Sequence, residues 1–408
     1  MDAAAQDAPG YGDAPICWKC RGAKTVAKHA ESKKERKRKR KRKRKRKASG
    51  AGVALPEHAV VSVPCPVCAG LGRLPPRQRQ VKHAADPGRA PRQHLRPPGW
   101  ATQGPAPVGA EGQQPEPGEE LCSLSGGWRI FQRIGGHRWT TEDVVTAWYA
   151  KRCAEERGLS VGSALDLGCG IGSVLLMTAW QYPAAVCRGV EAQQLSVSMA
   201  KRSVEFNVGA GSERVAVVGG DIREHAELPT AAGGAGWDLV TGTPPYFKVE
   251  FTGEGATKRA APAASSFPSC EQSAPARFEF RGGIEVYCAA AAAAMLDDGV
   301  FVVVEQAQDA HSTGRGGGFA DSSPPRVEAA AAAAGLAIYR RVDIEGKVGK
   351  KPLFSVFGMQ RRTEVAPPVA IESIAVRDDE GYHTERYAEL LTAMGIPPKV
   401  RGVTRVVD

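Results

Sequence analysis

Apolar and polar residues alternate along residues 121–365 in blocks that predict strands and helices in turn. Short, largely apolar runs bounded by polar residues or glycine are typical of buried strands, and longer runs with apolar residues at helical spacing are typical of helices. The strand-like runs are residues 163–169, 187–192, 214–222, 237–243, 299–307 and 352–359. The helix-like runs between and around them are residues 144–157, 172–180, 193–207, 284–296 and 325–340.

This alternation predicts an α/β fold. We expect a Rossmann-like, doubly wound, mostly parallel seven-stranded sheet with helices on both faces. The domain should span residues 121–365, and residues 366–408 should form a tail that packs back on it as a short strand and helix. In such sheets ligands bind beyond the carboxyl ends of the strands, so candidate chemistry is sought there.

The residues before this domain have a different composition. Residues 1–76 hold two Cys-x-x-Cys pairs on either side of a basic run at 33–47, and residues 77–120 form a linker rich in Pro and Gly. The chain carries +11 overall, whereas the basic run alone contains 14 Lys or Arg and one Glu, so the remainder is slightly acidic. A segment this charged buries nothing and repels itself, which predicts a largely disordered arm that binds polyanions.

Glycine and acidic residues gather where the first three strands of the domain end. The first strand runs into "DLGCGIG", whose glycines allow a tight turn and close approach of a ligand, and no phosphate-cradling lysine follows. The second strand ends in an acid placed to accept hydrogen bonds from two ribose hydroxyls, and the third in an acid that could receive an adenine amino group. This set suits a cationic nucleoside ligand. Its members are Asp166, Gly168, Gly170, Gly172, Glu191 and Asp221.

The fourth strand ends abruptly in "TPPYF", residues 243–247. Together with "LDLGCGIG", "GVEA" and "GGDI", this order of motifs resembles that of class I S-adenosylmethionine-dependent methyltransferases, in which Pro-Pro-Tyr marks the branch that methylates amino groups. "GHRWTTEDVVTAWYA" before the first strand resembles the bacterial enzymes that methylate the adenine N6 amine of tRNA-Val. The resemblance covers roughly residues 125–360.

The resemblance implies roles for these residues. S-adenosylmethionine would be the cofactor, with its methionine portion at the glycine loop and its ribose held by Glu191. The carbonyl of Pro244 would accept a hydrogen bond from the target amine, and Tyr246 would stack on the target base, with Phe247 extending that platform. The resemblance thus gives Thr243, Pro244, Pro245 and Tyr246 as the catalytic set.

Thr243 departs from the Asn or Asp that is usual at this position in the resembled family. Its hydroxyl can accept a hydrogen bond but reaches less far than an amide or carboxylate oxygen. Three interpretations stay open: a working variant, a different acceptor amine, or a degenerate site.

The cysteine pairs "CWKC" and "CPVC" predict a structural zinc held by Cys17, Cys20, Cys65 and Cys68. "CPVCAGLG" resembles the repeat of DnaJ-type zinc domains, although 44 residues separate Cys20 from Cys65. Closing so long a loop adds only about 0.8 kcal/mol over a loop of ~17 residues, so the insertion is tolerable. The alternative is four unliganded thiols in the arm.

No run of about 18 apolar residues occurs, so no membrane span is expected, and the start of the chain lacks the apolar region of a secretory signal. The sparse cysteines favour a reducing, intracellular compartment. The basic run could be a nuclear localisation signal or an RNA-binding arm, which leaves nucleus and cytoplasm both open.

Two features precede the first strand. "TTED" at 140–143 predicts a capping box that opens the helix at 144–157. His137 and Arg138, just before it, are either RNA-phosphate contacts or solvated loop residues.

The leading hypothesis is an N-methyltransferase acting on adenine N6 in tRNA or another structured RNA. DNA adenine and a protein glutamine side chain are rival substrates. A catalytically inactive nucleic-acid-binding protein is the rival class.

Overall fold

The computed structural model describes residues 25–29, 60–64, 96–109, 113–234, 236–246, 272–306, 324–364 and 368–403. The chain divides into two compact units, Met1–Pro87 and Gly88–Asp408. In the first unit, β1 (Thr25–His29) and β2 (Val60–Pro64) pair antiparallel, with Thr25 opposite Pro64. The predicted zinc cysteines, the basic run at 33–47 and Phe247 lie outside the described residues.

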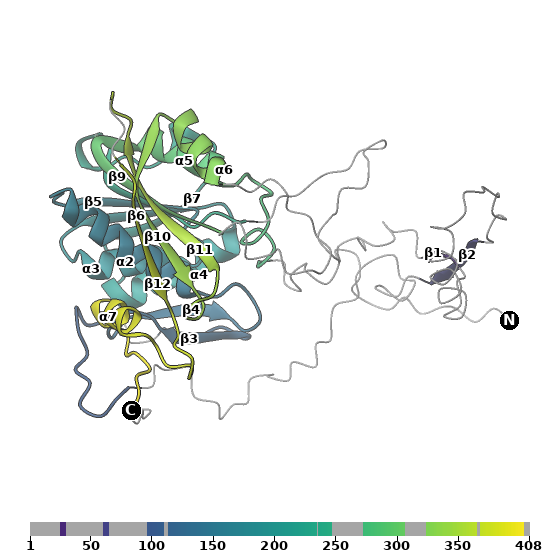
Figure 1. The fold of residues 1–408 in the computed structure, drawn as a ribbon, viewed down its shortest axis with the longest axis horizontal. Coiled ribbons are helices and arrows are strands. Elements are labelled where there is room, and N and C mark those ends of the chain that lie inside the picture. The colour runs from purple at the N-terminus through teal and green to yellow at the C-terminus, as the bar shows by residue number, and fades with distance from the viewer. Residues whose placement is uncertain are drawn as a thin grey trace. The chain divides into compact units, whose positions relative to one another are not determined.

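The second unit is built on an eight-stranded sheet with the order β12-β10-β11-β9-β8-β5-β6-β7 (Figure 1). Five of its seven strand pairs are parallel, and β11 runs antiparallel to both neighbours. The predicted Rossmann-like α/β class is therefore confirmed, with one strand more than the seven expected. The extra strand, β12, comes from the C-terminal tail and pairs in parallel with β10. The strands are β5 (Ser163–Leu167), β6 (Val186–Glu191), β7 (Val215–Gly219), β8 (Trp237–Gly242), β9 (Met295–Gln306), β10 (Leu336–Glu345), β11 (Pro352–Arg361) and β12 (Ala370–Ala375).

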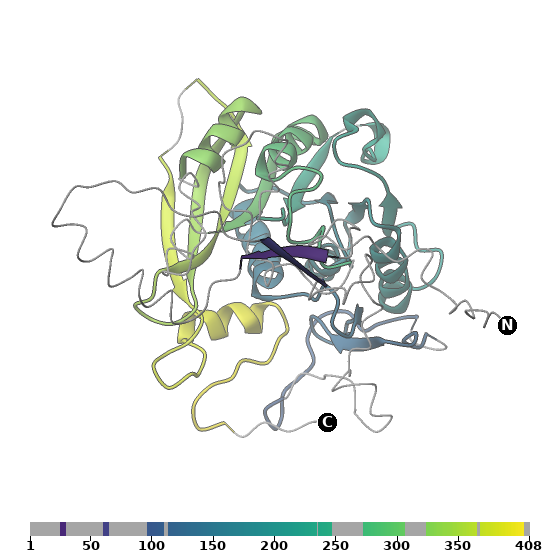
Figure 2. The same ribbon diagram turned by 90° about the vertical axis from the view of Figure 1, so that its right-hand side faces the viewer.

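Helices cover both faces of this sheet (Figures 1 and 2). One apolar core joins α2, α3, α4 and α7 to one face of the strands, and a second core joins α5 and α6 to the other. Strand β9 shows the division, because Val302 belongs to the first core and its neighbours Phe301 and Val303 to the second. The helices are α2 (Thr141–Glu156), α3 (Ser173–Gln181), α4 (Gln194–Val208), α5 (Ile284–Ala294), α6 (Pro324–Ala333) and α7 (Glu385–Ala393).

A short hairpin precedes the sheet in the chain. β3 (Glu119–Ser123) and β4 (Arg129–Arg133) pair antiparallel, and β4 packs on α4. The Ser203 hydroxyl of α4 accepts a hydrogen bond from the Phe131 amide at 3.0 Å. The described helices are all too short or too polar to cross a bilayer.

The run at 325–340, predicted as one helix, is divided between two elements. Helix α6 ends at Ala333, Gly335 adopts a left-handed φ of 71°, and β10 starts at Leu336. From Arg340 onward, alternate side chains of β10 are buried, as in a strand with one covered face. The alternation could not be recognised in the sequence, because Arg340, the buried residue at which it starts, is charged and not apolar.

The predicted capping box is confirmed. The Thr140 hydroxyl accepts a hydrogen bond from the Glu142 amide at 3.2 Å, and the Asp143 carboxylate accepts one from the Thr140 amide at 2.7 Å. Helix α2 therefore starts at a defined residue, which fixes the direction of the side chains in its first turn.

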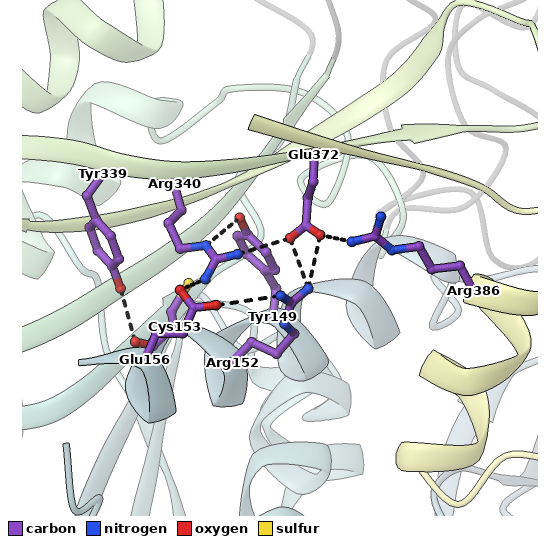
Figure 3. A network of polar contacts seen from close by, with 8 residues as sticks. All are labelled: Tyr149, Arg152, Cys153, Glu156, Tyr339, Arg340, Glu372 and Arg386. Atoms are coloured by element: carbon purple, nitrogen blue, oxygen red, sulfur yellow. Dashed lines mark hydrogen bonds and ion pairs between the residues drawn. The ribbon is translucent and has the colours of Figure 1, made fainter. Parts of the chain in front are cut away.

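A charged network attaches the C-terminal elements to α2 and β10 (Figure 3). The Glu372 carboxylate of β12 accepts hydrogen bonds from Arg152 at 3.0 and 3.1 Å and from Arg340 at 3.3 Å, and it also pairs with Arg386 of α7. Arg340 pairs in addition with Glu156. Arg340 is only 8 % exposed, so its charge depends on these carboxylates for compensation.

Replacing Glu372 with glutamine should lower the free energy of unfolding by about 2–3 kcal/mol, because three arginines lose the charge they share. Urea unfolding followed by circular dichroism measures this. Glu389→Gln, on the exposed face of α7, is the matched control and should change stability by less than about 0.5 kcal/mol. Equal midpoints for the two variants would contradict the assigned role of the network.

Candidate functional site

A cavity of about 1060 Å³, open solvent at its mouth included, lies at the carboxyl ends of the central strands. Its walls come from the segments after β5, β6, β7 and β8, from the first turn of α2 and from residues 275–282. Chain order reverses between β5 and β8, so this is the topological switch point at which ligands bind in open α/β sheets. Of the predicted site residues, those that line it are Gly168, Gly170, Glu191, Asp221, Thr243, Pro244, Pro245 and Tyr246.

The glycine loop contributes two residues to the cavity wall. Gly168 and Gly170 adopt φ angles of 60° and 56°, which disfavour any residue with a Cβ. A Cβ at Gly168 would also lie 2.2 Å from the hydroxyl oxygen of Tyr287. Gly172 lies behind the wall as the N-cap of α3, with φ of 88° and Ala200 of α4 against it. The loop therefore exposes its backbone to the cavity only because these positions are glycine.

Asp166 does not line the cavity but supports the loop from behind. It is 3 % exposed, and its carboxylate accepts hydrogen bonds from the Leu175 amide of α3 at 3.0 Å and the Thr241 hydroxyl of β8 at 2.8 Å. Burial raises the pKa of this carboxyl group to about 7. Asp166 thus ties β5, β8 and α3 together, and a role in cofactor binding through the loop stays a prediction.

Glu191, at the end of β6, reaches across to the glycine loop. Its carboxylate accepts hydrogen bonds from the Gly170 amide at 2.9 Å and the Gln193 amide at 2.7 Å, one on each oxygen. The residue is 7 % exposed, and burial raises its pKa. Since a carboxylate has about four acceptor positions, each oxygen keeps capacity to accept a further hydrogen bond from a ligand in the cavity.

Asp221 lines the cavity beyond β7 but is already paired. Both of its carboxylate oxygens accept hydrogen bonds from the Arg223 guanidinium, at 2.9 and 2.7 Å, and Arg281 lies 3.6 Å away. The hydrogen bonds from Arg223 are the main cause that lowers the pKa of Asp221. Asp221 is therefore an ionised carboxylate held in place, with less free acceptor capacity than Glu191.

The Thr-Pro-Pro-Tyr segment follows β8 and lines the cavity. Strand β8 lies on the other side of β5 from β6, the strand that ends in Glu191. Tyr246 is half-buried against the first core, and its hydroxyl hydrogen-bonds the Glu142 carboxylate. Burial raises the pKa of Tyr246 well above its usual value, so the phenol stays protonated and donates to that carboxylate.

The cavity lining also includes residues outside the sequence-predicted set, among them Glu142, Arg281 and Tyr287. Local sequence marked Glu142 only as part of a helix cap, and Tyr287 lies in an alanine-rich helix with no motif of its own. His137, which the sequence left between two roles, is half-buried in the cavity wall, and burial lowers its pKa, so it is neutral near pH 7. Its neighbour Arg138 pairs with Glu120.

No protein-family model matches the chain. Among curated proteins it is similar to a tRNA1(Val) (adenine(37)-N6)-methyltransferase of Porphyromonas gingivalis, 31% identical over 105 residues, which are 26% of this chain and 39% of the relative. It is also similar to a release factor glutamine methyltransferase of Caulobacter vibrioides, 28% identical over 138 residues, 33% of this chain and 44% of the relative. The chain thus spans less than half the length of the curated relatives it matches.

Among solved structures, the chain is similar to a protein of Agrobacterium tumefaciens described as a predicted O-methyltransferase. The identity is 16%, the TM-score is 0.40, and the match covers 64% of this chain and 100% of that one. So distant a likeness has no bearing on the function.

Proposed function

We propose that this chain transfers a methyl group from S-adenosylmethionine to an exocyclic amine, with adenine N6 in tRNA or another structured RNA as the acceptor. One observation carries the proposal. A single cavity at the switch point of the sheet brings the glycine loop, the Glu191 carboxylate and the Thr-Pro-Pro-Tyr segment together. The name of the Porphyromonas relative, which specifies adenine N6 in a tRNA, supports the choice of acceptor.

The lining of the cavity fits the cofactor. Among the described residues, four carboxylates and one guanidinium line it, which favours a cationic ligand such as a sulfonium; they belong to Glu142, Asp143, Glu191, Asp221 and Arg281. The free acceptor capacity of Glu191 matches the paired hydroxyls of a ribose. When bound there, S-adenosylmethionine supplies a methyl group on a good leaving group, so the chain's residues need mainly to position the acceptor.

The Thr-Pro-Pro-Tyr segment forms the acceptor side of the cavity. The Pro244 carbonyl can accept one N–H of the amine, and the Tyr246 ring offers a stacking surface for a base. The hydroxyl group of that ring interacts with the Glu142 carboxylate. A base in a folded RNA has to leave its stack to reach this surface.

Incubation of the purified chain with labelled S-adenosylmethionine and separate pools of RNA, DNA and protein tests the proposal. We expect label in RNA. Label confined to DNA or to protein would favour a rival substrate, and the name of the Caulobacter relative makes a glutamine side chain the specific protein rival. Cofactor binding too weak for calorimetry, together with RNA binding lost on deletion of residues 33–47, would favour the inactive binding protein.

We also propose that the N-terminal unit holds one zinc ion through Cys17, Cys20, Cys65 and Cys68. The antiparallel register of β1 and β2 supports this, because Thr25 lies opposite Pro64, which directly precedes Cys65. Elsewhere, the described part of the chain contains no cluster of metal-binding side chains. We expect about one zinc per chain by mass spectrometry of the purified protein and a loss of that zinc in Cys65→Ser. Metal-free wild-type protein purified without chelators would contradict the proposal.

A further inference from the structure

Glu142 is a carboxylate on the acceptor side of the cavity that the motifs do not assign to any role. It lies in the first turn of α2, lines the cavity and hydrogen-bonds the Tyr246 hydroxyl. Its Oε2 also lies 3.4 Å from the Thr140 hydroxyl. Both partners are hydroxyl groups, so its oxygens keep acceptor capacity on the side that faces the cavity.

The other three carboxylates in the cavity wall accept hydrogen bonds from backbone amides or an arginine, which occupy more of their acceptor capacity. Asp143 accepts from the Thr140 amide and from the Ser173 hydroxyl of α3. Glu191 accepts from two backbone amides, and Asp221 is paired with Arg223 through both oxygens. Glu191 ends β6 and Asp221 follows β7, and both strands lie on the opposite side of β5 from β8, which leads into the Thr-Pro-Pro-Tyr segment. Glu142 is therefore the carboxylate best placed to meet an amine at that segment.

An amine that receives a methyl group needs two things from the protein. Its N–H bonds have to be held so that the nitrogen lone pair points at the methyl carbon, and the nitrogen has to lose a proton once the new bond forms. The Pro244 carbonyl can hold one N–H but is no base, and the Thr243 hydroxyl is a weak acceptor with a short reach. A carboxylate supplies both the second acceptor and the base.

We propose that Glu142 accepts the second N–H of the substrate amine and takes up the proton that the nitrogen releases. The inference rests on the proposed function. The nitrogen lone pair forms the bond to the methyl carbon while the carbon–sulfur bond breaks with its electron pair on sulfur. The surplus proton on nitrogen passes to the Glu142 carboxylate and from there to water, so charge and atoms balance.

The surroundings of Glu142 suit that task. Burial raises its pKa to about 7, with a smaller rise from Asp143, while Thr140, Tyr246 and Arg277 act in the opposite direction. A base whose pKa lies near neutrality combines a useful ionised fraction with the ability to take a proton. Above about pH 7 the carboxylate is ionised and competent, so activity should rise with pH through this range.

Glu305 is another buried acid that could act as the base. Glu305, at the end of β9, is 8 % exposed, and its Oε2 has no hydrogen-bond partner in the described part of the chain. It does not line the cavity. Glu142, which does, is therefore the residue to test.

The test compares Glu142→Gln with the wild type and with Glu224→Gln, an exposed acid in the loop after β7. Glutamine keeps the length and a hydrogen-bond acceptor but takes no proton. We expect the affinity for S-adenosylmethionine, measured by calorimetry, to stay within about threefold, and kcat on RNA to fall by about 10²–10⁴-fold. The rise of kcat around pH 7 should disappear.

A compensating variant makes the test sharper. Thr243→Asp places a carboxylate at the end of β8, and in the Glu142→Gln background it should raise kcat at least tenfold. Unchanged kcat and pH profile in Glu142→Gln would overturn the inference, as would a fall in kcat caused by loss of cofactor binding or of thermal stability. A wild-type chain that methylates no pool would instead refute the proposed function, so the two failures are distinguishable.

Discussion

Replacing Glu191 with alanine is expected to weaken S-adenosylmethionine binding by about 10²–10⁴-fold. Without the carboxylate, the ribose of the bound cofactor would lose two hydrogen bonds. Each of them is worth about 1.5–3 kcal/mol when one partner is charged. The substitution also removes the acceptor for the Gly170 amide, so the glycine loop keeps only its backbone hydrogen bond from Cys169 to Val190 of β6. Isothermal titration calorimetry with the full chain measures the effect.

Two variants make this result specific. Glu213→Ala removes an exposed carboxylate from the segment before β7 and should leave the affinity within about twofold. Glu191→Gln keeps one acceptor oxygen for the loop or the ligand, so its affinity should fall between that of the alanine variant and the wild type. An affinity of Glu191→Ala within threefold of the wild type would show that the cofactor is not held at this carboxylate.

Replacing Tyr246 with alanine is expected to lower kcat/KM for RNA by about 10³-fold while cofactor affinity changes little. The loss combines base stacking, worth about 1–3 kcal/mol, with release of the Glu142 carboxylate from its hydroxyl partner. Tyr246→Phe keeps the ring and loses only the hydroxyl, so a fall of about tenfold is expected. Steady-state methylation with labelled cofactor gives both values.

Tyr382→Ala is the aromatic control, since Tyr382 lies near the C-terminus beside Lys399 and Arg401 and does not line the cavity. It should leave kcat/KM unchanged. If Tyr246→Ala stayed within threefold of the wild type, the stacking surface would lie elsewhere.

The part of the site that the sequence could predict follows from one rule of topology. In a parallel sheet the carboxyl ends of neighbouring strands meet at one edge, so residues that follow β5, β6, β7 and β8 come together although they are far apart in the chain. The Gly170 amide, for example, donates a hydrogen bond to the Glu191 carboxylate, although the two residues follow or end different strands. The same rule does not distinguish residues that line the cavity from residues that support its wall. Asp166 is of the second kind, because its carboxylate is hydrogen-bonded to α3 and β8 and does not line the cavity.

The residues that the sequence missed depend on packing between distant elements. Glu142 belongs to a helix cap, and the local pattern of "TTED" is satisfied by capping alone. That this first turn faces Tyr246 follows from how α2 packs on the sheet, which no local signal specifies. Tyr287 reaches the cavity from α5 for the same reason, and only the close approach of its hydroxyl to Gly168 reveals it.

The fold shows a similar division. Largely apolar runs predicted the strands β5, β6, β7, β8, β9 and β11, as expected for strands of a sheet covered on both faces. β10 escaped detection because Arg340 occupies one of its buried positions, where Glu372 and Glu156 compensate its charge. A buried ion pair between elements distant in sequence cannot be inferred from either segment alone.

Nucleoside analysis of RNA incubated with this chain tests the proposed methylation of adenine N6. Total RNA is incubated with the purified wild type and S-adenosylmethionine carrying a deuterated methyl group, then digested and examined by mass spectrometry. We expect deuterated N6-methyladenosine with the wild type and far less of it with Tyr246→Ala. Deuterium found only in a nucleoside other than N6-methyladenosine, or in no nucleoside while cofactor binding is intact, would refute the proposed activity.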